Sequence, residues 1–374
     1  MNGHFFIPKL YDIMTFKKEY KNMKLQLTLN SLALILCCGD LIPSSTQPIS
    51  TQEWQGIEKK IKKGQEKALQ KGEWQEIEKK IKSAHKEPSM ITGMSIDTLT
   101  QIIGLDEFTA HKIEKRQKLL PDLFYALQNL ENQDIGVTTI YEEDYPASLR
   151  VLGTKMPLVI SYIGDLSLSY GVNISVAGPQ MMNKTMRHVT KEIMKKISKE
   201  GYTVVVGGSK GVEELALRTQ LTNNGNAVLF VADHMFDKIR LYSKYIKQNK
   251  LVIMTANDPY ALFDVTHALD KNLYICGMVF AQIVTGTHIG SGPVWFTSIQ
   301  NIHSHWTRQL VYETLDYSGN IRLIEMGEAH FTDEDLKSEV TLAEILDNHE
   351  TVIKKDDPSI DQMTIFEFIE DKHE

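Results

Sequence analysis

The feature of the sequence that most constrains the fold is an alternation of elements between Asn173 and Thr222. Two apolar, β-branched segments, at 174–177 and 202–206, flank an amphipathic pattern at 184–199. The second segment ends in the glycine-rich stretch 207–211, and another helical pattern follows it. Neither segment alternates apolar and polar residues, which is typical of parallel strands covered on both faces. The chain is therefore predicted to be an α/β protein with a mostly parallel sheet and helices on both faces.

The glycine-rich stretch is a candidate site for an anion, and it consists of Gly207, Gly208, Ser209, Lys210 and Gly211. Glycines let a ligand approach the backbone, and the first N–H groups of the following helix are unpaired donors. Lys210 adds a positive charge. The alternative is a tight turn between strand and helix with no ligand. The spacing matches neither a Walker loop nor the dinucleotide-binding fingerprint.

The composition describes an ordinary globular protein, with 42% apolar and 24% charged residues. The net charge of −7 means that any contact with nucleic acid must depend on a local basic patch. Three cysteines form neither a disulfide framework nor a metal motif, which fits the cytoplasm. The apolar run Leu25–Cys38 is too short to span a bilayer and is interpreted as a buried helix, so no membrane partner is expected.

An internal repeat marks the amino-terminal part of the chain, where residues 53–62 recur almost unchanged as residues 73–82. Each copy places Trp, Ile and Ile on one face of an amphipathic helix. Its lysine-rich face is interpreted as solvated, with contact to nucleic acid as the alternative. Four regions are predicted: a helical region at 1–94, a small helical module at 95–135, the sheet domain at 136–330 and an acidic tail at 331–374.

The remaining elements are predicted from apolar runs and helical periodicity. Strands are expected at 137–141, 226–232, 251–254, 279–284, 307–313 and 322–325. Helices are expected at 95–103, 108–118, 121–133, 238–248 and 296–305.

Several motifs resemble those of the DNA-processing protein A family (DprA/Smf). The first strand ends Val176-Ala177-Gly178-Pro179-Gln180, where the family has Val-Gly-Ser/Thr-Arg. The second strand ends Gly207-Gly208-Ser209-Lys210-Gly211-Val212-Glu213, where the family has Ser-Gly-x-Ala-x-Gly-Ile-Asp. Upstream, Tyr145-Pro146-Ala147-Ser148-Leu149 is similar to the family's Tyr-Pro-x-x-Leu, and 157–164 is similar to its Pro-x-x-Leu-Tyr-x-x-Gly. The resemblance extends over about residues 95 to 330.

The resemblance implies a Rossmann-like domain that binds single-stranded DNA without catalysis or a cofactor. It further implies that the protein acts in DNA uptake and recombination, protects incoming strands and helps to load a recombinase, which would then be a partner. Members of this family form dimers through this domain, so a homodimer is expected.

Three loops are expected to converge at the carboxyl edge of the sheet and to hold the DNA. Their residues, with two from a later helix, are Gly178, Gln180, Gly207, Gly208, Ser209, Lys210, Gly211, Lys271, Asn272, Ser291 and Trp295. Cations would hold phosphates, and the aromatic rings of Trp295 and Tyr274 are candidates for base stacking. Gln180, Lys210 and Lys271 stand where the family has arginine, and lysine lacks the bidentate fork of arginine, so weaker binding is expected.

Two other functions remain open. Gly290-Ser291-Gly292-Pro293 weakly imitates a motif of phosphoribohydrolases, for which Glu213 and Glu214 would be the nearby carboxylates. Carboxylates in a first helical turn more often complement the helix dipole. The third function is a module that senses a nucleotide without turnover. The spacing of His288, His303 and His305 suits no metal site.

Overall fold

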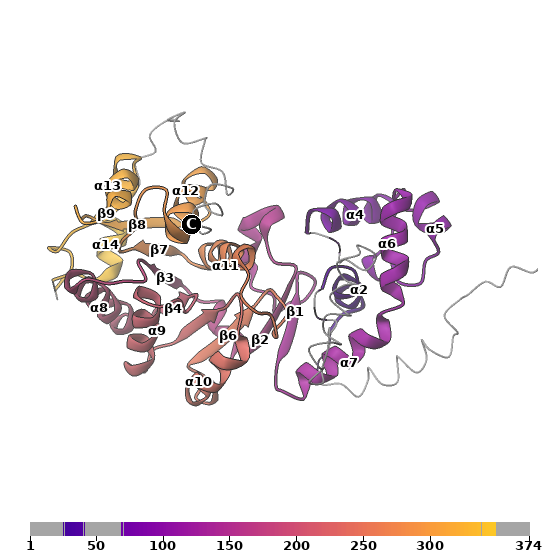
Figure 1. Cartoon of the computed structure of the whole chain (residues 1–374), viewed down its shortest axis with the longest axis horizontal. Helices are drawn as coiled ribbons and strands as arrows, with labels where there is room; N and C mark the ends of the chain where they lie inside the picture. The colour runs from indigo at the N-terminus through magenta and orange to yellow at the C-terminus, as the bar shows by residue number, and fades with distance from the viewer. Residues whose placement is uncertain are drawn as a thin grey trace, which may run out of the picture. The chain divides into compact units, whose positions relative to one another are not determined.

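The structure is a computed structural model, and it describes residues 25, 27–39, 41, 69, 71–337 and 339–348. The first copy of the repeat, residues 1–24 and most of the predicted tail lie outside these residues. The chain divides into two compact units (Figure 1). The first contains the chain up to Tyr145 with Pro157–Tyr162 and Ala256–Asp258, and the second contains the rest. The predicted boundaries at 94, 135 and 330 stay predictions.

The first unit is mainly helical, as predicted. Its helices are α2 (Leu29–Cys38), α4 (Lys71–Ser83), η1 (Pro88–Ile91), α5 (Ile96–Gln101), α6 (Glu107–Gln117) and α7 (Leu120–Glu131). The strands β1 (Gly136–Thr139) and β2 (Val159–Ile163) pair antiparallel. The second copy of the repeat is helix α4, and its predicted apolar stripe of Trp74, Ile77 and Ile81 is buried.

Helix α2 confirms that the apolar run near the amino terminus is a buried helix. Its amino end is capped by Thr28, whose hydroxyl accepts a hydrogen bond from Ser31 N. Its carboxyl end is satisfied by buried Arg116, which donates to the carbonyl oxygens of Leu36 and Gly39 at 2.5 and 2.8 Å. Among the described residues, no helix has both the length and the apolar character to cross a membrane.

The second unit is built on parallel strands in the order β6-β5-β4-β3-β7-β8-β9. They are β3 (Asn173–Ala177), β4 (Thr203–Val206), β5 (Ala227–Phe230), β6 (Leu251–Thr255), β7 (Ala281–Val284), β8 (Arg308–Tyr312) and β9 (Ala329–Phe331). The chain builds one half of the sheet outward from β3, then returns to β7 on the other side of β3. Ligands of such sheets bind where the order reverses, at the carboxyl ends of these two strands.

Helices cover both faces of this sheet, which confirms the predicted Rossmann-like class (Figure 1). Helices α8 (Lys184–Lys199), α9 (Val212–Thr222), α10 (Met235–Lys247) and α14 (Leu342–Asn348) contribute to the large core on one face. Helices α12 (Gly292–Ser304) and α13 (Ser318–Glu325) contribute to the apolar cluster on the other face, and α11 (Val265–Met278) packs against α12 and strands β3, β4 and β5. The short helices η2 (Ala147–Lys155) and η3 (Leu166–Ser169) complete the unit.

The prediction of a strand at Arg322–Glu325 is wrong, because these residues end helix α13. Asn320 and Leu323 are fully buried at a spacing of three residues, which suits a helix rather than a strand. Gly327, at φ +104°, follows the end of the helix, and the edge strand is β9. The helix predicted from Phe296 begins earlier, at Gly292, with Pro293 in its first turn.

Candidate nucleic-acid interface

Strands β3 and β7 pair along their length and end side by side, just before the first predicted loop and before the segment that leads to Gly290. Thr285 donates from its backbone N–H and its hydroxyl to the carbonyl oxygen of Ala177, at 2.9 and 3.1 Å. A Cβ atom on Gly178 would lie 2.2 Å from the Thr285 hydroxyl oxygen, so only glycine fits here. The ends of β3 and β7 are therefore in direct contact, and the convergence of Gly290–Trp295 with the first loop stays a prediction.

The glycine-rich stretch joins them. Gly211 has a φ of +88°, and a Cβ atom on it would lie 2.3 Å from the carbonyl oxygen of Pro179. The N–H of Val212 donates to that same oxygen at 3.2 Å. Residues 207–211 thus lie directly against the end of the first loop, at the amino end of α9.

Lys271 is the cation most closely associated with this stretch. It lies on α11, its side chain is 7% exposed, and its Nζ is 3.4 Å from the Ser209 hydroxyl. A Cβ atom on Gly207 would lie 2.3 Å from that Nζ. Among the described residues, no carboxylate lies within ion-pair distance of Lys271. A buried ammonium group is costly without a counter-charge.

A second buried lysine, Lys196, provides a comparison, because its ammonium group has two hydrogen-bond acceptors. Lys196 is also 7% exposed, but its Nζ donates to the carbonyl oxygens of Lys337, at 2.6 Å, and Val340. Lys271 has one long hydrogen bond instead. The comparison indicates that the ammonium group of Lys271 has donor capacity to spare, which a hydrogen-bond acceptor such as a phosphate oxygen could use.

Two further charged side chains act on the glycine-rich stretch. The Glu213 carboxylate accepts a hydrogen bond from Ser209 N at 2.9 Å, so one donor of the loop is already occupied. Lys238, on α10, donates from Nζ to the carbonyl oxygen of Gly208 at 3.3 Å. Lys210 is exposed. Sequence reasoning missed Lys238, because a lysine on an amphipathic helix carries no distinguishing signal.

A small cavity lies beneath the loops, at the point where the strand order reverses. Its volume of about 20 Å³ suits a single water molecule. The polar side chains that line it are those of Ser175, Glu213, Asn272, Gln282 and Thr297. The Ser175 hydroxyl is buried, and it has no hydrogen-bond partner among the described residues.

The predicted aromatic platforms are not accessible to bases. Trp295 is 6% exposed and lies on α12 in an apolar cluster with Val284 and Val311. Tyr274 is 3% exposed, its ring is 5.5 Å from that of Phe230, and its hydroxyl donates to Asp270. Base stacking by these two rings would require them to leave the core.

The remaining predicted site residues differ in exposure. Two are exposed, Gln180 and Ser291, and five are half-buried: Gly178, Gly208, Ser209, Gly211 and Asn272.

Other aromatic side chains are exposed near the same edge. The ring of Tyr260, which is 46% exposed, contacts the half-buried ring of Phe236 at 4.6 Å between centroids and a tilt of 33°, and Phe263 is 61% exposed. His234 N donates to the carbonyl oxygen of Ala261, which ties this segment to the start of α10, one turn before Lys238. The signal that could have found them is the position of Tyr260 and Phe263 after strand β6, at the carboxyl edge.

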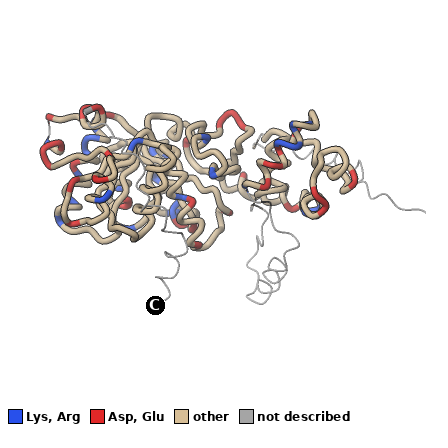
Figure 2. The backbone as a smooth tube through the Cα atoms, turned by 90° about the horizontal axis from the view of Figure 1, so that it is seen from above, with Lys and Arg blue, Asp and Glu red and all other residues tan. Residues whose placement is uncertain are grey.

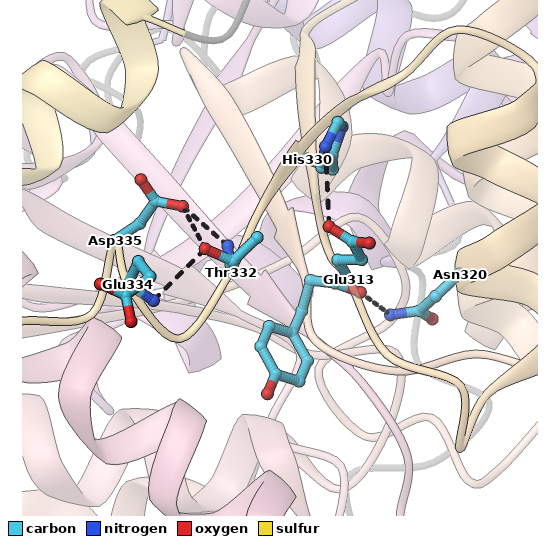
Figure 3. Close-up of polar contacts among 7 residues, drawn as sticks. Glu313, Asn320, His330, Thr332, Glu334 and Asp335 are labelled. Atoms are coloured by element: carbon cyan, nitrogen blue, oxygen red, sulfur yellow. Dashed lines mark hydrogen bonds and ion pairs between the residues drawn. The ribbon is translucent and has the colours of Figure 1, made fainter.

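A larger groove of about 540 Å³ lies at the ends of β8 and β9, and four carboxylates line it: Glu313, Glu325, Asp333 and Glu334. In Figure 3, Glu313 pairs with His330, and Thr332 binds both Asp335 and the backbone of Glu334. Burial, together with the hydrogen bond to Asp333, raises the pKa of Tyr312 to about 12. The acidic lining repels a phosphate backbone.

Outside this groove, cations and anions are interspersed over the second unit, as Figure 2 shows.

One buried amide connects the loops around β7 and β8. The Asn320 side chain accepts a hydrogen bond from Thr287 N at 2.8 Å. It donates to the carbonyl oxygens of Tyr312, at 2.7 Å (Figure 3), and Thr285, at 3.2 Å. Asn320 is fully buried, so its amide is part of the core rather than of the surface.

Comparison with known proteins identifies the family. Residues 136–335, more than half of the chain, match the family described as DNA recombination-mediator protein A. The X-ray structure of DNA processing protein A from Streptococcus pneumoniae has the same fold, with a TM-score of 0.60 and 18% identity. That match covers 81% of this chain and 99% of the other.

A structure of DNA processing protein A from Helicobacter pylori, described for its single-stranded DNA binding mode, matches at a TM-score of 0.47 and 15% identity. It covers 57% of this chain and 97% of that one. Among curated protein sequences, none matches. The matched motifs, the strand order and the shared fold agree: this chain belongs to the DNA recombination-mediator protein A family, DprA.

Proposed function

We propose that the protein binds single-stranded DNA along the carboxyl edge of its parallel sheet and acts in DNA recombination and uptake without catalysis. The observation that carries the proposal is Lys271, a buried ammonium group against the glycine-rich stretch with no carboxylate within ion-pair distance among the described residues. A phosphate at this place would accept hydrogen bonds from Lys271 and from the backbone of residues 207–211.

The exposed aromatic side chains extend the interface. Phe263 and Tyr260 offer exposed aromatic rings, and Lys238 links α10 to the glycine-rich stretch. Alternating cations and rings suit single-stranded DNA, because phosphates need charge and unpaired bases need stacking surfaces. Family membership supports the same ligand. A recombinase partner and a homodimer are part of the proposal on the same basis.

The alternative is a nucleotide-binding or nucleotide-hydrolysing protein. The cavity under the loops is far smaller than a nucleotide, and Glu213 is the one carboxylate among the described side chains that line it. That carboxylate is bonded to the backbone of Ser209. These observations favour the DNA-binding function.

The test is fluorescence anisotropy with a labelled oligothymidylate at two salt concentrations. Lys271→Met keeps the length of the side chain and removes its charge, and we expect about tenfold weaker binding. Lys195→Met is the matched control, since Lys195 is exposed on α8 and paired with Glu192. Equal affinity of Lys271→Met and the natural protein would refute this site. No binding by the natural protein at low salt would refute the function.

A further inference from the structure

The Glu213 carboxylate occupies a backbone N–H group that could otherwise donate to a phosphate. It accepts from Ser209 N at 2.9 Å, in the glycine-rich stretch that also receives Lys271. A carboxylate bound to a loop of backbone N–H groups at a helix start resembles a bound phosphate in charge and in geometry. In this structure the loop therefore already contains an anion that belongs to the chain itself.

The adjoining cavity offers that carboxylate another place. Glu213 lines it together with Ser175, Asn272 and Thr297. The Ser175 side chain is 2% exposed, and its hydroxyl lacks a hydrogen-bond partner among the described residues. A buried hydroxyl without a partner is uncommon and indicates a missing acceptor or donor. A carboxylate oxygen entering the cavity would supply the acceptor.

We propose that Glu213 is an internal competitor of DNA: its carboxylate occupies the Ser209 N–H in the free protein and turns toward Ser175 when a phosphate displaces it. The inference rests on the proposed function, because it concerns the same loop. Binding then includes the cost of moving one anion before another can enter. The affinity of the site is accordingly set by Glu213 as well as by its cations.

The nearby charges distinguish Glu213 from its neighbour. Glu214 follows it in the first turn of α9, but its carboxylate is 43% exposed and pairs with Arg218 at 3.5 Å. Glu213, in contrast, accepts from the N–H of Ser209, whose hydroxyl lies 3.4 Å from Lys271 Nζ. Glu214 therefore serves as a matched control, with the same charge on the same helical turn.

The test measures oligothymidylate affinity for Glu213→Gln, Glu213→Ala and Glu214→Gln. Removing a competing carboxylate should tighten binding about tenfold, which corresponds to 1.4 kcal/mol. Glu214→Gln should change the affinity by less than about twofold, as expected for an exposed, paired carboxylate. If Glu213 only held the loop in shape, its removal would weaken binding or leave it unchanged. The two roles therefore predict opposite signs.

A double-mutant cycle tests the second position of the carboxylate. Ser175→Ala should weaken binding when Glu213 is present and should have no effect in the Glu213→Ala background. Equal effects of Ser175→Ala in both backgrounds would overturn the movement into the cavity. Thermal melting of each variant shows whether the fold is retained, and Glu213→Ala replaces Glu213→Gln if the amide variant does not fold.

The outcomes separate this inference from the proposed function. If the natural protein binds DNA and neither Glu213 variant binds more tightly, the internal competitor is refuted and the DNA-binding function stands. If only the Glu213 variants bind, competition between Glu213 and phosphate is supported, whereas the proposed function of the natural protein is refuted. If no variant binds DNA at low salt, both are refuted.

Discussion

The ammonium group of Lys271 lies against Gly207, so that a Cβ atom on this glycine would be only 2.3 Å from Nζ. Helix α11, which covers the sheet, thus places the ammonium group of Lys271 against the loop that follows β4. Glycine at position 207 is required by this side chain, rather than by an unusual backbone conformation.

Gly207→Ala should therefore impair binding more than stability. The added methyl group would displace the end of the Lys271 side chain, which is flexible, at a cost of about 1 kcal/mol in the free energy of unfolding. Displacement of Nζ should weaken binding to oligothymidylate about tenfold. Anisotropy and urea denaturation check the two effects. Gly72→Ala is the control, since nothing lies within 4 Å of its added methyl group. Unchanged DNA affinity for Gly207→Ala would contradict the placement of Lys271.

Gly211→Ala should instead destabilise the fold. Both Gly211 and Gly201 have positive φ, +88° and +78°, but only at Gly211 would a Cβ atom meet backbone oxygens, those of Pro179 and Gln180. Gly201→Ala should cost about 1 kcal/mol for its backbone conformation alone. Gly211→Ala should cost about 3 kcal/mol or more, because the first loop must also move. Urea denaturation of both variants measures the difference, and equal losses would show that the two loops are not in contact.

Glu328 should make stability depend on pH. Burial raises the pKa of its carboxyl group to about 7, well above the ordinary value of 4.5. The unfolded chain releases the proton near pH 4.5 while the folded protein retains it, so stability falls as pH rises from about 4.5 to about 7. Glu328→Gln cannot ionise, and it should match the natural protein near pH 4.5 and exceed it in stability at pH 7.5. Denaturation at pH 4.5, 6 and 7.5 tests this. Parallel pH profiles of the two proteins would exclude Glu328 as the cause.

Phe263→Ala should weaken DNA binding without destabilising the protein. The side chain is 61% exposed, so little apolar surface is lost from the core. Loss of one stacking surface should cost about 1–3 kcal/mol of binding free energy. Phe280→Ala is the control, because Phe280 is 49% exposed just before β7, at the opposite edge of the sheet. Equal affinities of these two variants would remove Phe263 from the interface.

Much of the second unit could be predicted from the sequence, because parallel strands buried on both faces are continuous apolar runs. Strands β3, β4 and β7 are of this kind, and the glycines that follow β3 and β4 mark their ends. The segment at 322–325 was misjudged since a run of Arg-Leu-Ile-Glu is too short to separate the two periodicities. The helical structure of this segment follows from tertiary packing, in which Asn320 and Leu323 are both buried.

The site was harder to predict than the fold. The convergence of the loops follows from strand order, but whether a side chain faces solvent or core does not. Trp295 was expected in a loop, and it is buried because α12 starts three residues before it. The contact of Lys238 with Gly208 could not be predicted, since it depends on how helix α10 packs beside the loop, and the exposure of Phe263 depends likewise on packing. Proximity of this kind arises only from the tertiary structure.

The three hydrogen bonds of Asn320 have a consequence for kinetics. One amide connects the segment after β7 with the end of β8, so the entropy of ordering that backbone is lost during folding rather than during binding. If DNA binds at the neighbouring ends of β3 and β7, as proposed, the backbone that it meets after β7 is already in its final shape. The rate of DNA capture should then follow ionic strength and diffusion, with no slow rearrangement of this backbone between encounter and complex.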